Sequence, residues 1–144
     1  MFISTPFDET AVQYLESIGC PMYKVASHEI TDLHLIATIA ATGKPIIIST
    51  GMATMEEIAN ALLAARTNQW HPKITLLKCT SAYPAKFDDM NLATIAHMRE
   101  IYSTDVGLSD HSQGSVPAIV ATAMGATMIE KHITLSRDGG PDDG

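Results

Sequence analysis

Six short apolar segments, each ending in small polar residues, alternate with amphipathic segments along the chain. Continuous apolar runs such as Ile46–Ile48 are typical of strands in a parallel sheet that is buried on both faces. The pattern therefore predicts six strands joined by helices. The predicted strands are Phe2–Thr5, Met22–Ser27, Pro45–Thr50, Ile74–Thr80, Val106–Asp110 and Met128–His132.

The amphipathic segments between these runs carry signals for where helices begin and end. Thr54 and Glu57 form a capping box, which predicts a helix that begins at Met55. Gly19, Gly43 and Gly125 follow segment ends, where a helix commonly finishes on a left-handed residue. The predicted helices are Thr10–Ile18, Leu33–Thr42, Met55–Arg66, Leu92–Ile101 and Val116–Met124, the first of them with Ala11, Tyr14, Leu15 and Ile18 on its buried side.

Alternating strands and helices leave two architectures of the α/β class, an open doubly wound sheet and a barrel. The length of 144 residues favours the open sheet, because a complete eight-stranded barrel takes about 250 residues. The strand ends favour the barrel. An open sheet binds its ligand at one switch point, whereas nearly every predicted strand here ends in polar groups, as at a barrel mouth.

Composition narrows the class of protein. The chain is 46% hydrophobic and has a formal net charge of −7, which fits a packed enzyme and argues against a general nucleic-acid binder. The two cysteines, Cys20 and Cys79, do not make a disulfide framework, and no apolar run is long enough to cross a membrane. These observations predict a cytoplasmic protein with no membrane or nucleic-acid partner.

Two histidines at neighbouring strand ends are candidate metal ligands. Residues two apart on a strand share a face, so Ser109 points with His111, and Glu130 points with His132. Two imidazoles with water and an acidic group suit Mn²⁺, Mg²⁺, Co²⁺ or Zn²⁺. The alternative is that one histidine caps a helix while the other lies in the core, and spacing alone does not decide between the two.

Lys24 lies inside an apolar strand, where a lysine is costly unless it is paired or has a function. It could form a Schiff base as in an aldolase, hold a phosphate or carboxylate, or make a buried ion pair with Glu29 or Glu130. Hydroxyl groups near helix starts add a candidate phosphate cradle. These small polar residues are Ser27, Ser49, Thr50, Gly51, Thr80, Ser81 and Ser109.

Six motifs, in this order, resemble the sialic acid synthase family over essentially the whole chain. Within that family, the Ser81–Ala85 run, the Asn91-Leu92 region and the Gly139-Gly140 tail are most similar to the pseudaminic acid synthase branch. The motifs are Phe2–Asp8, Tyr23–Ser27, Gly43–Met52, Cys79–Pro84, Gly107–His111 and Glu130–His132.

The resemblance implies condensation of phosphoenolpyruvate with an N-acetylated amino-sugar aldose, giving a nine-carbon nonulosonic acid and phosphate. N-acetylneuraminate and legionaminate are the alternative products. The resemblance also implies that His111 and His132 bind a divalent metal, with Mn²⁺ favoured over Mg²⁺ or Co²⁺. It assigns phosphoenolpyruvate contacts or reacting groups to Lys24, Ser27, Glu29, Ser49, Ser81 and Ser109, substrate contacts to Tyr83 and Glu130, and a ligand-orienting role to Asp110.

The family also implies a fold. The chain would correspond to about strands three to eight of an eight-stranded TIM barrel, so that residues 1–144 form a partial catalytic barrel without the family's C-terminal antifreeze-like domain. The whole enzyme would be a homodimer. Two other interpretations stay open. One is an aldolase with Lys24 as its Schiff-base lysine. The other is a truncated chain that is inactive alone and prone to aggregate at its exposed edge strands.

Overall fold

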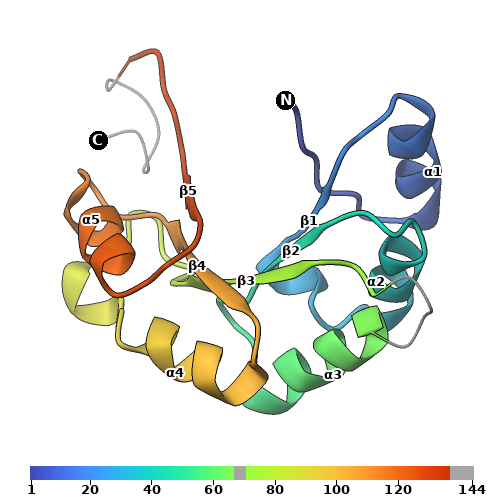
Figure 1. Ribbon diagram of the computed structural model, residues 1–144. Coiled ribbons are helices and arrows are strands. Elements are labelled where there is room, and N and C mark those ends of the chain that lie inside the picture. Colours follow the sequence, from blue (N-terminus) through green and yellow to red (C-terminus); the bar gives the residue numbers. More distant parts are fainter. Residues whose placement is uncertain (67–70, 137–144) are drawn as a thin grey trace. The chain divides into compact units, whose positions relative to one another are not determined.

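Helices and strands alternate along the chain in the computed structural model, which describes residues 1–66 and 71–136 (Figure 1). The five helices are α1 (Glu9–Ser17), α2 (Leu33–Ala40), α3 (Met55–Arg66), α4 (Thr94–Tyr102) and α5 (Val116–Ala123). The five strands are β1 (Tyr23–Val25), β2 (Ile46–Ser49), β3 (Ile74–Cys79), β4 (Asp105–Asp110) and β5 (Ile129–Lys131). Two short 3₁₀ turns, η1 (Ser27–Glu29) and η2 (Phe87–Asp89), follow β1 and β3.

The strands follow one another in the sheet in chain order, β1-β2-β3-β4-β5. The β1–β2 and β4–β5 pairs are parallel, as the buried apolar runs predicted. The prediction of a regular, buried strand at Phe2–Thr5 is wrong. Ser4 makes a single bridge to Tyr23, and Phe2 and Ile3 are 48% and 44% exposed, because this segment has a strand partner on one side only among the described residues.

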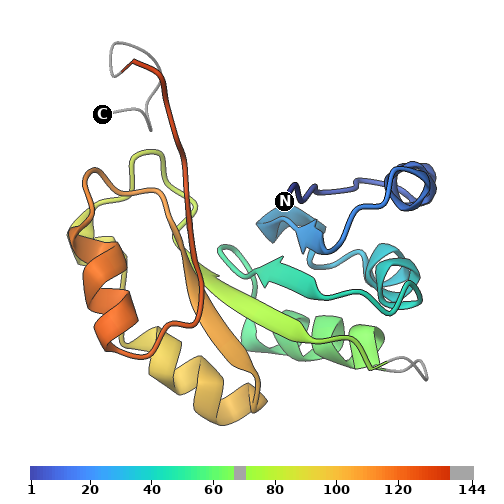
Figure 2. The same ribbon diagram turned by 45° about the horizontal axis from the view of Figure 1, so that its top comes forward.

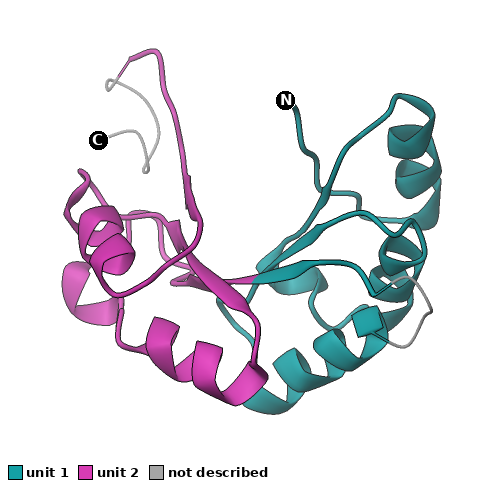
Figure 3. Ribbon diagram, in the orientation of Figure 1, with its two compact units in different colours: residues 1–75 teal, residues 76–144 magenta. Residues whose placement is uncertain are grey.

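The chain divides into two compact units, residues 1–75 and 76–144, of which the second is described through residue 136 (Figure 3). The core of unit 1 lies between the strands and the contacting helices α2 and α3. Within α1, Val12 and Leu15 are buried whereas Tyr14 is 64% exposed. The predicted buried side of α1 is therefore wrong, apart from Leu15. The fully buried side chains of unit 1 include Tyr23, Val25, Ile36, Ile39, Ile46 and Ile48.

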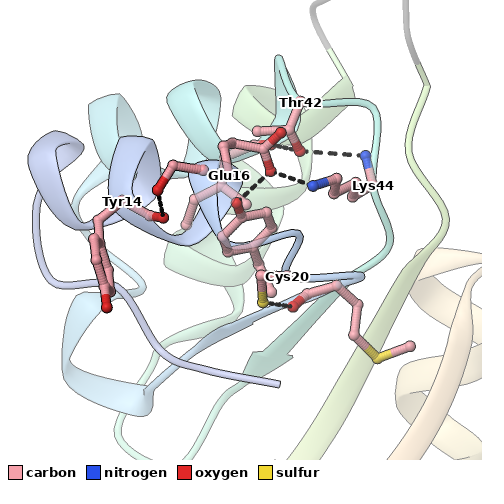
Figure 4. Close-up of polar contacts among 9 residues, drawn as sticks. Tyr14, Glu16, Cys20, Thr42 and Lys44 are labelled. Carbon is pink, nitrogen blue, oxygen red and sulfur yellow. Dashed lines mark hydrogen bonds and ion pairs between the residues drawn. The ribbon is translucent and has the colours of Figure 1, made fainter. Parts of the chain in front are cut away.

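A polar cluster ties α1 to the rest of unit 1 (Figure 4). The Tyr23 hydroxyl and the Lys44 ammonium both donate to Oε1 of Glu16. Burial raises the pKa of the Tyr23 hydroxyl, and the adjacent Glu16 carboxylate raises it further. Burial also raises the pKa of Glu16, but the bonds from Lys44 and Tyr23 outweigh it and leave the pKa below its ordinary value. One carboxylate thus links α1, β1 and the loop before β2.

Unit 2 is organised around β4, on which both α4 and α5 pack (Figure 2). Its fully buried side chains include Leu76, Leu77, Ile95, Val106 and Leu108. β5 is more exposed than the predicted buried strand, with Ile129 at 37% exposure. Like the first segment, β5 has a partner strand on one side only among the described residues.

The predicted helix boundaries agree with the structure within a few residues. The capping box is confirmed, because the Thr54 N–H donates to Glu57 at 2.7 Å and the Glu57 N–H donates to the Thr54 hydroxyl at 3.2 Å. Gly19, Gly43 and Gly125 have φ of 74°, 72° and 92°, the left-handed conformation that was predicted. No helix in the described ranges is both long and apolar enough to span a bilayer. The Gly139-Gly140 tail lies outside the described residues.

Candidate functional site

His111 and His132 are brought together at the ends of β4 and β5 in unit 2. The parallel register pairs Ser109 with Glu130, so the residues that follow them lie beside each other. The two imidazole ring centroids are 5.1 Å apart, with ring planes at 86°. The Tyr83 ring lies 4.3 Å from the His111 ring and 6.1 Å from the His132 ring. The sequence therefore placed this histidine pair correctly.

Ser109 and Glu130 form a polar pair beside the histidines. Ser109 is 2% exposed, and its hydroxyl donates to Oε1 of Glu130 at 2.7 Å. The same hydroxyl lies 3.4 Å from Nε2 of His111. A buried serine thus fixes the Glu130 carboxylate close to the histidine pair.

Asp110 makes bonds to the loop after β4 and to β5. Its Oδ1 accepts from the Ser112 N–H at 2.9 Å and from the Ser112 hydroxyl at 2.6 Å, and its Oδ2 pairs with Lys131 at 3.0 Å. Side chains alternate along a strand, so Asp110 points away from the face that carries Ser109 and His111. Asp110 therefore holds the loop after β4 to β5, and it fixes the backbone that follows His111.

The donors present fit a divalent metal bound by a pair of histidines. Within residues 1–66 and 71–136 no group of three or more His, Cys, Asp or Glu side chains is close enough to form a metal site. Two neighbouring imidazoles could supply two ligands of such a site, and water and substrate would have to supply the others.

Lys24 and Lys78 are the buried lysines at the strand ends. Lys24 is 9% exposed, and its ammonium donates to the Val25 carbonyl at 3.3 Å. Lys78 is 8% exposed, and it donates to the Thr80 hydroxyl at 2.6 Å. Burial lowers the pKa of the Lys78 ammonium. Lys24 therefore has the buried position that was expected of it, in unit 1.

The expected phosphate cradle of unit 1 has its predicted place before α3, but one of its backbone amides is already bonded. Ser49 ends β2, and Thr50 and Gly51 lie in the turn that leads to α3 at Met55. The Gly51 N–H is not open to a ligand as predicted, because it donates to the Ser27 hydroxyl at 3.0 Å. Ser27 thus ties η1 to the turn after β2.

Two buried polar atoms of unit 1 have no hydrogen-bond partner among the described residues: Oγ of Ser49 and Oε2 of Glu29. Ser49 is 2% exposed at the end of β2. The other oxygen of Glu29 pairs with Nε2 of His28 at 2.8 Å. A buried polar atom without a partner is costly and needs an explanation, of which a ligand is one. Both residues were candidates from the sequence.

The loop after β3 holds two further candidates and a feature that sequence reasoning missed. Ser81 and Tyr83 are both exposed there, Tyr83 by 52%. Directly after them the chain forms a cavity of about 410 Å³. The only signal in the sequence was position: five of the lining residues follow Tyr83 directly, and Gln113 stands two residues after His111. The cavity is lined by Pro84, Ala85, Lys86, Phe87, Asp88 and Gln113.

Comparison with known proteins gives consistent matches. The family model described as the NeuB family matches residues 1–144. The pseudaminic acid synthase of Helicobacter pylori is 51% identical over 135 residues, which is 93% of this chain and 39% of that protein. The N,N'-diacetyllegionaminic acid synthase of Campylobacter jejuni is 43% identical over 98% of this chain and 43% of that protein. The chain spans about two fifths of the length of these relatives.

Solved structures match the fold. The N-acetylneuraminic acid synthetase of Leptospira borgpetersenii, solved with citrate, has a TM-score of 0.89 and 35% identity over 96% of this chain and 49% of that one. The spore coat polysaccharide biosynthesis protein spsE of Bacillus subtilis has a TM-score of 0.89 and 29% identity over 99% of this chain and 43% of that one. The predicted fold class, an α/β TIM barrel of which this chain is part, is confirmed.

Proposed function

The chain belongs to the NeuB family, as its motifs predicted, and from this premise we propose that the protein condenses phosphoenolpyruvate with an N-acetylated amino-sugar aldose. The products would be a nine-carbon nonulosonic acid and inorganic phosphate. Support comes from relatives that are named as pseudaminic, legionaminic and N-acetylneuraminic acid synthases. Pseudaminic acid is the preferred product because the H. pylori synthase has 51% identity. Legionaminate and N-acetylneuraminate are the alternatives.

The observation that carries the proposal is the pair of buried atoms without partners, Oγ of Ser49 and Oε2 of Glu29. A hydroxyl can donate to an anionic oxygen, and a carboxylate oxygen can accept a proton or orient a water molecule. We assign Ser49 to the phosphate or carboxylate of phosphoenolpyruvate, together with Lys24 and Ser27 in unit 1. We assign Glu29 to the water or proton transfer of the reaction.

The bond changes are the following. The C2=C3 π electrons of phosphoenolpyruvate form a C–C bond to the aldehyde carbon of the sugar, the C=O π pair moves to the aldehyde oxygen, which takes up a proton, and C2 is left electron-deficient. Water adds at C2, its proton passes to a base such as Glu29, and the resulting tetrahedral intermediate loses phosphate through cleavage of the C2–O bond. The Lys24 ammonium would balance the negative charge of phosphoenolpyruvate. The attraction between the two charges is strongest where they are buried, as Lys24 is.

The unit 2 residues would handle the aldehyde. His111 and His132 would hold a divalent metal, which polarises a carbonyl oxygen when it is bound. Ser109 keeps Glu130 in place beside the pair, and the Tyr83 ring packs against His111 and narrows the space that a sugar can occupy. Ser81 is assigned to phosphoenolpyruvate more loosely, because it is exposed. Mn²⁺ is the metal that we propose, with Mg²⁺ and Co²⁺ as alternatives.

A direct test measures phosphate release from phosphoenolpyruvate and a set of mono- and diacetamido aldoses, N-acetylmannosamine among them, with Mn²⁺, using the complete polypeptide in which this sequence occurs. With water labelled with ¹⁸O, we expect the label at C2 of the sugar acid, because the bridging oxygen leaves with the phosphate. Label in the phosphate would mean P–O cleavage and a different reaction.

The metal assignment is tested separately. We expect chelation, His111→Ala and His132→Ala each to lower the rate by at least about 10²-fold, because polarisation of the carbonyl is lost. Bound metal, counted by atomic absorption, should fall with the rate. His97→Ala, on α4, is the matched control and should retain both. If borohydride instead traps substrate on Lys24 and chelators do not inhibit, the Schiff-base aldolase hypothesis replaces this one.

A further inference from the structure

The two carboxylate oxygens of Glu29 have different surroundings. Oε2 is buried and has no hydrogen-bond partner among the described residues, whereas Oε1 lies 2.8 Å from Nε2 of His28. An ionised carboxylate can only accept hydrogen bonds, so the His28 ring donates its Nε2–H to Oε1. The His28 side chain is 65% exposed and the Glu29 side chain is 13% exposed. One oxygen of Glu29 is therefore bonded to a residue at the surface, and the other is left in the interior.

His28 and Glu29 belong to the 3₁₀ turn η1, whose backbone is fixed by its own bonds. The Glu29 N–H donates to the Ala26 carbonyl at 3.1 Å. The Ser27 hydroxyl accepts from the Gly51 N–H at 3.0 Å, and this bond ties η1 to the turn after β2. The two side chains therefore extend from a backbone that is held in place, and the direction of the Glu29 carboxylate depends on its own side-chain bond to His28.

The His28 ring also has an aromatic neighbour, Phe7. The two rings are stacked, with centroids 6.4 Å apart and planes at 15°. Phe7 directly precedes Asp8, whose carboxylate accepts from the Ala11 N–H at 2.7 Å and caps α1. The stacking limits rotation of the imidazole, so Nε2 stays directed at Glu29.

A second histidine–glutamate pair in unit 1 shows what an ordinary surface pair looks like. His34 pairs with Glu9, and their side chains are 79% and 51% exposed. Such a pair contributes little, because water solvates both partners. Glu29 differs from Glu9 because one of its oxygens is shielded from water. The orientation of the Glu29 carboxylate therefore decides which oxygen lies in the interior, and the bond to His28 sets that orientation.

We propose that His28 is a positioning residue for Glu29, and that it keeps Oε2 as the oxygen that takes the proton from the attacking water. As the water oxygen bonds to C2, one of its O–H bonds breaks and the proton passes to Oε2. Without the bond to Oε1, the carboxylate can turn, and the base is misdirected in part of the molecules. The proposal rests on the function proposed above, and it adds a residue outside the metal and phosphoenolpyruvate contacts.

The pair is tested first without turnover, by ¹H–¹⁵N NMR of the histidine rings in the complete polypeptide without metal. Glu29→Gln should move the ring nitrogen signals of His28, because an amide replaces the carboxylate that accepts from Nε2, and it should leave the signals of His34 unchanged. Glu9→Gln is the matched control, with the opposite expectation for the two histidines. His28 signals that do not respond to Glu29→Gln would overturn the proposal, because the bond would be absent in solution.

Steady-state kinetics with phosphoenolpyruvate, the aldose and Mn²⁺ then test the role. His28→Ala should lower kcat about tenfold, the effect of losing a hydrogen bond to a charged group, and leave both KM values within about twofold. His28→Gln should recover most of kcat, because its amide can still donate to Oε1. His34→Ala, the exposed histidine of the surface pair, should keep both kcat and KM.

Thermal unfolding separates this role from a purely structural one. The melting temperature of His28→Ala should stay within about 3 °C of the unsubstituted protein, because a partly exposed pair contributes little to stability. If His28→Ala keeps its kcat, or if His28→Gln does not restore it, His28 does not position Glu29. If the unsubstituted protein releases no phosphate with any aldose, the proposed function fails and this role fails with it. Phosphate release that His28→Ala leaves unchanged refutes the role of His28 alone.

Discussion

Gly107, in the middle of β4, has no space for a side chain. A Cβ at this position would lie 2.4 Å from the carbonyl oxygen of Met128 and 2.8 Å from Cδ2 of Leu77. The carbonyl is backbone and cannot move without separating β4 from the chain that leads into β5, the two strands that carry His111 and His132. We therefore expect Gly107→Ala to lower the free energy of unfolding by about 3 kcal/mol, at the upper end of overpacking effects.

Gly114 is the matched control for this prediction. It has open space around the position of a Cβ but a φ of +74°, so Gly114→Ala should cost only the left-handed strain of about 1 kcal/mol. Urea unfolding of both variants separates the two effects. An equal loss of unfolding free energy in the two variants would mean that the Met128 carbonyl can shift at little energetic cost.

Among the elements, α1 has two carboxylates that tie it to unit 1: Glu9 pairs with His34, and Glu16 accepts from Tyr23 and Lys44 (Figure 4). Because the folded pKa of Glu16 lies below its ordinary value of 4.5, its contribution is present above pH 4.5 and is lost as the pH falls through the folded pKa. We expect Glu16→Gln to cost about 0.5–1 kcal/mol at pH 7, a value reduced for solvent screening. The difference from the unsubstituted protein should shrink as the pH falls from 4.5 towards 3.

Thermal unfolding at a series of pH values checks this prediction. Glu100→Gln, an exposed carboxylate on α4, is the control, and it should change the unfolding free energy by less than about 0.5 kcal/mol. A Glu16→Gln difference that stays constant between pH 7 and pH 3 would show that the ionised carboxylate does not hold α1. The helix would then be retained by buried Val12 and Leu15 and by the Glu9–His34 pair.

At the level of the whole molecule, apolar side chains are exposed along the segments that have one strand partner. Phe2 and Ile3 are about half exposed, and Ile133 and Leu135 after β5 are 96% and 107% exposed. Exposed strand edges with apolar side chains favour association between chains. We expect a polypeptide of residues 1–144 to form larger species as its concentration rises, which sedimentation velocity would detect. Ile133→Ser with Leu135→Ser should reduce this association, and a monomer at all concentrations would contradict it.

The sequence by itself predicted five of the strands, the five helices and, within a few residues, the helix ends, and it also named the candidate site residues. These features depend on local physics. Apolar runs must be buried, a capping box satisfies the first backbone N–H groups, and glycine takes the left-handed conformation at a helix end. The β-strand period also sufficed to put Ser109 with His111 and Glu130 with His132, because consecutive parallel strands end at the same edge.

Only the tertiary structure decided which polar groups find partners. The sequence could not show that Asp110 bonds to Ser112 and Lys131, or that the Ser27 hydroxyl accepts from the Gly51 N–H. These bonds form because the fold brings the partners close together in space. It also could not show that Ser49 and Glu29 each have a buried atom without a partner among the described residues. Nor could it show that the loop after Tyr83 forms a cavity, one wall residue of which, Ala85, is hydrogen-bonded to His111. Periodicity fixes which face a side chain takes, whereas burial and hydrogen bonding depend on what the fold brings against that face, as the misplaced buried side of α1 illustrates.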